Sequence, residues 1–224
     1  DKLTAELYGP VIDEAHEHGL RVTAHVFTLD DAKGLLRAGI DAFAHGVRDQ
    51  DIDDELIQLW TDHPEVVLVP NLPNPGVAVD LSWLSGTIPA DRLGEMQAAQ
   101  QDRPAVQESF GIQARNLDRL NSAGVKIAFG TDGSSPWTSH QEMEDMVRSG
   151  MTPAEVIVAA TSTSAELIEL DAGTVAAGKL ADFVVLDANP LDDITNTRRI
   201  SDVYIRGQRV ERETMRERWT GSEQ

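Results

Sequence analysis

The sequence contains no cysteine, which excludes disulfide bonds and thiolate metal sites. A transition metal bound by this chain must therefore be held by histidine and carboxylate side chains. Basic residues are also scarce: 19 lysines and arginines stand against 38 aspartates and glutamates, which gives a net charge of −19. Because nucleic acids and anionic membrane surfaces attract clustered basic side chains, we expect no nucleic acid and no membrane partner.

Long apolar runs are missing as well. The sequence has no stretch of about 18 consecutive apolar residues, the length that a transmembrane helix needs. Its opening residues lack the basic and apolar regions of a signal peptide, so we expect a cytoplasmic protein. They also lack an initiating methionine and begin directly on a helical pattern, from which we expect the chain to be a fragment of a longer protein.

One unit recurs along the chain: an amphipathic stretch ends in glycine, a short apolar run follows, and a polar residue closes the run. Each glycine suits the left-handed position just after a helix. Each apolar run is typical of a strand buried on both faces of a parallel sheet. The glycines and their closing residues are Gly19 with His25, Gly39 with His45, and Gly124 with Asp132.

Further elements can be placed between and after these units. The run VVLVPN predicts a strand at Val66–Asn71. Residues 72–103 are rich in proline, glycine and tryptophan, which is typical of an excursion that shapes a pocket or its lid. Helices are predicted from Pro104, near His140–Arg148, and from a capping box that begins at Thr152.

Four strand–helix units of this kind predict an α/β fold in which residues 1–170 form half of a (β/α)8 TIM barrel. From Gly173 the sequence changes to short strands and turns, which predicts a small β appendage over residues 171–212. We expect residues 213–224 to be a charged tail that frays. In such barrels the active site lies at the C-terminal ends of the strands.

Three side chains fall at that height. His25, His45 and Asp132 close separate strands, and two imidazoles with one carboxylate form a donor set that suits zinc. A bound divalent metal with an open position lowers the pKa of a coordinated water to about 7. The sequence therefore predicts a metal site made by His25, His45 and Asp132.

Other polar residues near the strand ends are weaker candidates. Asn71 closes its strand, and we expect it to hydrogen-bond the substrate. His140 lies in the segment after Asp132, where it contacts either the substrate or only the start of the next helix. Glu142 has two interpretations, a substrate contact or an exposed glutamate of the first helical turn. The remaining histidines, at positions 16, 18 and 63, are expected to be solvated.

A family resemblance follows from these motifs in their order: VTAH, DAFAHG, VKIAFGTD, MTPAEVIVAAT and GKLADFVVLDANPL. Together they resemble the C-terminal portion of the amidohydrolase superfamily, in its imidazolonepropionase and metal-dependent prolidase branch. The resemblance implies barrel strands five to eight for residues 1–170 and part of a composite β-sandwich for residues 171–212. It also implies zinc, two ions in the complete site.

The resemblance assigns roles to the three ligands. His25 and His45 would hold the more exposed metal, and Asp132 would bind the buried metal and act as the general base. The His-x-His pair of strand one and the lysine of strand four have no counterpart here, since His16 and His18 lie on a helical pattern. We therefore expect the N-terminal half of the same protein to complete the site.

Three functions remain open. The leading hypothesis is a hydrolase of C–N bonds in a small amide, cyclic amide or dipeptide, active only as the complete protein. The second is a deaminase of a heterocycle that uses one metal ion. The third is a remnant that binds a ligand without turnover. A homo-oligomer is compatible with the sequence.

Overall fold

The computed structural model describes residues 2–133 and 135–220, apart from the side chains of 217, 219 and 220. Four strands form one parallel sheet in the order β1-β2-β3-β4. The register aligns His25 with Ala44 and Ala44 with Val69, so the C-terminal ends of the first three strands lie level. The strands are β1 (Thr23–His25), β2 (Ala42–Ala44), β3 (Val67–Val69) and β4 (Lys126–Ile127).

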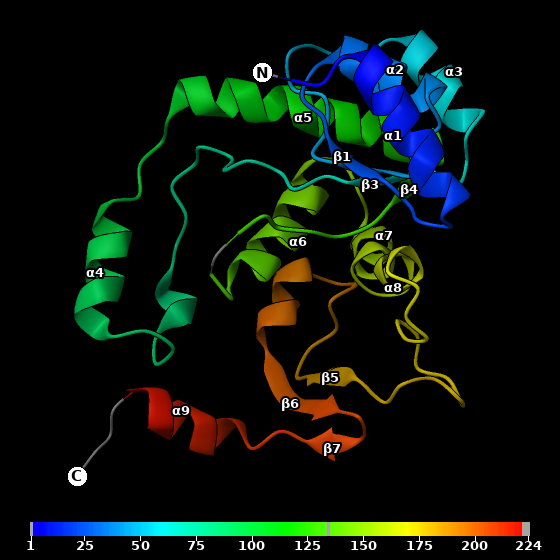
Figure 1. Ribbon diagram of the computed structural model, residues 1–224. Helices are drawn as coiled ribbons and strands as arrows, with labels where there is room; N and C mark the ends of the chain where they lie inside the picture. Colours follow the sequence, from blue (N-terminus) through cyan, green and yellow to red (C-terminus); the bar gives the residue numbers. More distant parts are fainter. Residues whose placement is uncertain (1, 134, 221–224) are drawn as a thin grey trace.

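The predicted order of helix, glycine and strand is confirmed. The three glycines that were expected to end helices have φ angles of +68°, +81° and +80°, which only glycine adopts readily. In the view of Figure 1, one group of helices lies above the strands and a second group lies below them. The first group is α1 (Ala5–Glu17), α2 (Leu29–Arg37), α3 (Asp54–Thr61) and α5 (Pro104–Ser122), and the second is α6 (Thr138–Arg148), α7 (Pro153–Val158) and α8 (Ser164–Leu167).

The core lies between the sheet and these helices. Phe43, Leu68 and Ile127 project from the strands into it, and all three are buried. Phe43 packs against Trp60 of α3 with ring centroids 4.8 Å apart. The expected caps are present, because α5 begins at its proline and the capping box at Thr152 starts α7.

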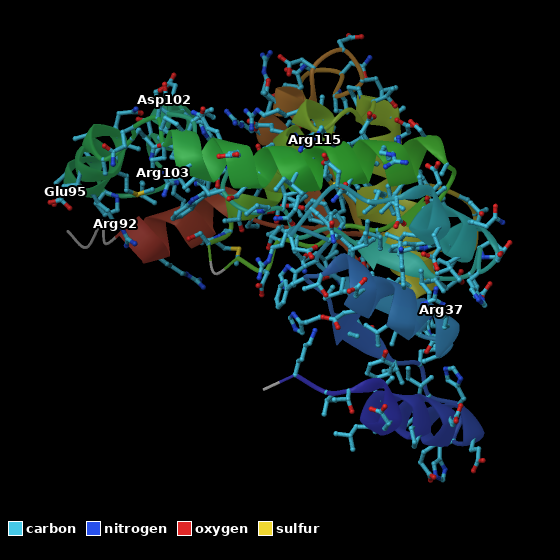
Figure 2. All side chains as sticks on the ribbon, turned by 90° about the horizontal axis from the view of Figure 1, so that it is seen from above. Arg37, Arg92, Glu95, Asp102, Arg103 and Arg115 are labelled. Carbon is cyan, nitrogen blue, oxygen red and sulfur yellow. The ribbon has the colours of Figure 1, made fainter. Side chains whose placement is uncertain are left out.

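Between β3 and α5 the chain makes the expected excursion. It contains a 3-10 turn, η1 (Ser82–Leu84), and a helix, α4 (Ala90–Ala98), which the weak periodicity of this segment did not predict. Figure 1 shows α4 far from the sheet. Figure 2 shows the same region from above, with Glu95 and Arg103 at the opposite end of the molecule from Arg37.

After α8 the chain forms a second sheet. Strands β5 (Phe183–Leu186), β6 (Ile200–Ile205) and β7 (Gln208–Arg209) pair in antiparallel fashion, and a 3-10 turn, η3 (Ile194–Arg198), precedes β6. This second sheet is the predicted β appendage.

The fraying expected of residues 213–224 stays a prediction, and the structure gives most of these residues a helical conformation. A helix, α9 (Arg212–Thr220), follows the second sheet, and residues 221–224 lie outside the described part of the chain. The Arg212 guanidinium donates to the carbonyl groups of Ile200 and Ser201 on β6, which ties the start of α9 to the second sheet. None of the helices in the described residues is long and apolar enough to span a membrane.

Candidate metal-binding active site

Three predicted ligands meet at the C-terminal ends of the parallel strands. His25 ends β1, His45 follows β2 directly, and Asp132 follows β4. The rings of His25 and His45 have centroids 5.0 Å apart. His45 Nε2 lies 3.8 Å from Asp132 Oδ2. Strand register thus brings together residues that are separated by more than a hundred positions in the sequence.

The backbone at these strand ends is strained. His45, Asn71 and Asp132 have φ angles of +69°, +43° and +46°. A left-handed backbone costs a residue with a side chain about 1 to 3 kcal/mol, so it persists where the surrounding structure requires it. Only two other non-glycine residues in the described part of the chain share this conformation. Such outliers cluster at functional sites, and here they coincide with residues that were chosen for their chemistry.

His45 is the most buried of the three predicted ligands, with 9% of its surface exposed. Burial lowers its pKa, and the neighbouring His25 lowers it further. A hydrogen bond with the backbone of Asn71 partly opposes this decrease in the pKa of His45. The ring is therefore neutral near pH 7, and its Nε2 lies 3.8 Å from Asp132 Oδ2. A hydrogen bond to a backbone group is one way in which proteins orient a histidine as a metal ligand.

These donors fit part of a divalent metal site. His45 Nε2 and Asp132 Oδ2 lie 3.8 Å apart, a separation that suits ligands of two neighbouring metal ions, which stand about 3.5 to 4 Å apart in two-metal sites. Among the described residues, however, no group of three or more histidine, aspartate or glutamate side chains is arranged to hold a metal ion by itself. The chemistry of the set suits the metal, and the set needs further donors to be complete.

Asn71 lies beside these residues. Its side-chain oxygen Oδ1 is buried and has no hydrogen-bond partner. It also lies close to the backbone of Gly130, where an added Cβ would stand 2.4 Å from Oδ1. A buried acceptor without a partner is costly, so this amide is a candidate for binding a donor group of a ligand.

His140 takes part in a different cluster. Its Nδ1 lies 3.1 Å from Thr197 Oγ1, and its ring makes an edge contact with Trp83 at 5.7 Å. Burial lowers the pKa of His140, and the charge of Arg198 lowers it further. The structure thus joins His140 to the turn η3 before β6, and its expected substrate contact stays a prediction.

Glu142 differs from one of its two interpretations, because it is not an exposed residue of the first turn. Only 5% of its surface is exposed. Both carboxylate oxygens accept the backbone N–H of Leu72, at 3.0 and 3.2 Å. Burial raises the pKa of Glu142 to about 8, and the charge of Asp145 contributes. The local sequence holds no signal for this, since Leu72 lies 70 positions away.

Comparison with known proteins identifies the family of this chain. Residues 3–210 match the profile of the Amidohydrolase family. An uncharacterized protein of Mycobacterium tuberculosis is 36% identical over 160 residues, which cover 66% of this chain and 37% of that protein. An imidazolonepropionase of Deinococcus deserti is 34% identical over 143 residues, which cover 60% of this chain and 36% of that enzyme. A solved prolidase complexed with N-methylphosphonate-L-proline matches with a TM-score of 0.68 and 25% identity.

The match to that prolidase covers 93% of this chain and 49% of the prolidase, so the chain spans about half the length of the solved structure. It spans little more than a third of the two curated relatives. The predicted fold class, the C-terminal half of a TIM barrel with a β appendage, is confirmed by this alignment with amidohydrolase barrels. Since the family profile matches most of its residues, this chain belongs to the amidohydrolase family.

Proposed function

We propose that the chain is the metal-binding C-terminal part of a hydrolase that cleaves a C–N bond in a small amide, cyclic amide or dipeptide. The observation that carries the proposal is the approach of His45 Nε2 to Asp132 Oδ2, at 3.8 Å, beside the ring of His25. The substrate classes come from similarity to an imidazolonepropionase and a prolidase.

The fitted cofactor is zinc, with His25 and His45 as ligands of one ion and Asp132 as a ligand of a second. A divalent metal supplies a Lewis acid that polarises the carbonyl group and lowers the pKa of water to about 7. The remaining donors are assigned to the rest of the protein, because the chain spans about half of the solved prolidase. The rest of the protein is thus the partner that the proposed metal site requires.

Asp132 is the proposed general base. Its carboxylate takes a proton from the attacking water and passes it to the leaving nitrogen, so that one side chain serves both halves of the reaction. Its side chain is 67% exposed, which lets a substrate reach it. Asn71 Oδ1, buried and without a partner, would accept a hydrogen bond from an N–H group of the substrate.

The test uses the full-length protein. Asp132→Asn is expected to reduce kcat by about a thousandfold or more, because it removes the base while keeping the shape of the side chain. Asp13→Asn, an exposed carboxylate of α1, is the matched control and should keep the activity. Activity is followed on a panel of dipeptides and cyclic amides. Near-normal rates in Asp132→Asn would sink the mechanism.

Metal analysis separates the alternatives. Two zinc ions per full-length chain are expected for the hydrolase. One ion per chain, together with release of ammonia from a heterocycle, would favour the deaminase instead. Failure to retain any metal while His25, His45 and Asp132 are intact would favour a binding protein without turnover.

A further inference from the structure

A cavity of about 290 Å³ lies beside the candidate site, between the excursion after β3 and helix α6. Leu72 and Thr131 line it, and each adjoins a residue of the site, Asn71 and Asp132 respectively. Trp83 and Trp137 form aromatic parts of its wall. Its size is close to the lower end of the range for small-molecule sites.

The charged part of the lining of this cavity is mostly acidic. Four carboxyl groups and two guanidinium groups face it, which are Asp80, Glu142, Glu144, Asp145, Arg148 and Arg198. Ion pairs join Asp145 to Arg148 and Glu144 to Arg198. Asp80 accepts hydrogen bonds from the backbone and the hydroxyl of Ser82. Among the described residues, Glu142 is left with a backbone amide and no cation.

The hydrogen bond that Glu142 makes does not by itself require a carboxyl group at this position. Its one contact, the N–H of Leu72, would be accepted equally well by the side-chain oxygen of glutamine. A buried carboxylate instead carries a large desolvation cost. An ionisable group kept in such a place, in a cavity that adjoins a candidate active site, is a candidate functional position.

A cation is the ligand that this position favours. An ammonium or guanidinium group beside Glu142 would lower the pKa of its carboxyl again, since an opposite charge stabilises the ionised form. The cavity wall already holds one such arrangement: the Arg198 guanidinium lies 4.2 Å from the ring centroid of Trp83 and pairs with Glu144. An anion would find no free cation in this wall among the described residues, because Arg148 and Arg198 pair with Asp145 and Glu144.

We propose that this cavity binds an ammonium or guanidinium group at one end of the substrate, with Glu142 as its counter-ion. The proposal goes beyond the proposed function and rests on it only in calling the ligand a substrate. It implies selectivity for small amides that carry a basic side chain.

The test is a binding measurement on the full-length protein with the substitution Asp132→Asn, which removes turnover. The probes are N-acetyl-L-lysinamide and N-acetyl-L-norleucinamide, which differ in the terminal ammonium group alone. Isothermal titration calorimetry is expected to show tighter binding of the lysine probe by about tenfold or more. Glu142→Gln is expected to reduce this preference to about twofold or less, and Glu108→Gln, an exposed glutamate of α5, is expected to retain it.

Equal affinity for the two probes, or no binding of either, would overturn the proposal without any substitution at Glu142. A tenfold preference that persists in Glu142→Gln would overturn the role of that residue. Because binding is measured in the inactive background, loss of cation selectivity leaves the proposed hydrolase standing. Conversely, a protein that hydrolyses nothing but still prefers the lysine probe keeps the cavity proposal alone.

Discussion

Replacing Glu142 with glutamine should make the stability of the protein less dependent on pH. In the folded state burial raises the pKa of this carboxyl from 4.5 to about 8. The unfolded chain therefore holds fewer protons at this group than the folded chain between those two values. Stability falls as pH rises through this window and then stays constant above it. The full difference of 8 − 4.5 = 3.5 pKa units corresponds to about 5 kcal/mol, as an upper limit.

Urea denaturation of the full-length protein and of Glu142→Gln measures this effect. Near pH 5 the two free energies of unfolding should differ by less than about 1 kcal/mol, and above about pH 8 the variant should be more stable by several kcal/mol. A smaller slope should remain in the variant, because burial also raises the pKa of Asp145, to about 7. Parallel pH profiles, or a variant that loses stability at high pH, would refute the assignment of a buried and protonated Glu142.

Three further changes test other parts of the site. His45→Ala should lower the metal content of the full-length protein, measured by atomic emission, more strongly than it lowers stability. Gly130→Ala would bring a methyl group to 2.4 Å from Asn71 Oδ1 and should reduce kcat about tenfold, whereas Gly94→Ala, with open space around it, should not. Asn116→Ala removes a buried amide that bonds three backbone groups in the segment after β2, and should lower the urea-derived stability by about 3 kcal/mol.

The elements of the fold could be predicted because their signals are local. A glycine in a left-handed conformation ends a helix wherever the helix lies, so Gly39 and Gly124 marked their boundaries without knowledge of the rest of the chain. The capping box at Thr152 is equally local. The lengths of the strands were less certain, and the strand predicted at Val66–Asn71 covers only Val67–Val69. Strand ends depend on pairing with a neighbour rather than on the residues themselves.

The candidate ligands could be predicted for a related reason. Parallel strands separated by similar loops end at one edge of a sheet, so polar residues at matching offsets converge there. No such rule predicts the burial of Glu142. It depends on a contact between α6 and Leu72, which lies on another segment of the chain. His140 likewise contacts Thr197, which belongs to the β appendage. Sequence spacing finds residues that share a repeat, and it misses contacts between segments that do not.

The backbone at the strand ends links these two observations. A strand that continued in extended conformation would point successive side chains to opposite faces of the sheet. The left-handed conformations of His45, Asn71 and Asp132 interrupt that alternation where each chain segment leaves the sheet. Asn71 then leads into Leu72, whose amide is held by the carboxyl group of Glu142. The hydrogen bond between Leu72 and Glu142 thus lies one residue from the strained backbone of Asn71, which belongs to the candidate metal site. A substitution at Asn71 should therefore alter the environment of Glu142, and a substitution at Glu142 should alter the candidate metal site.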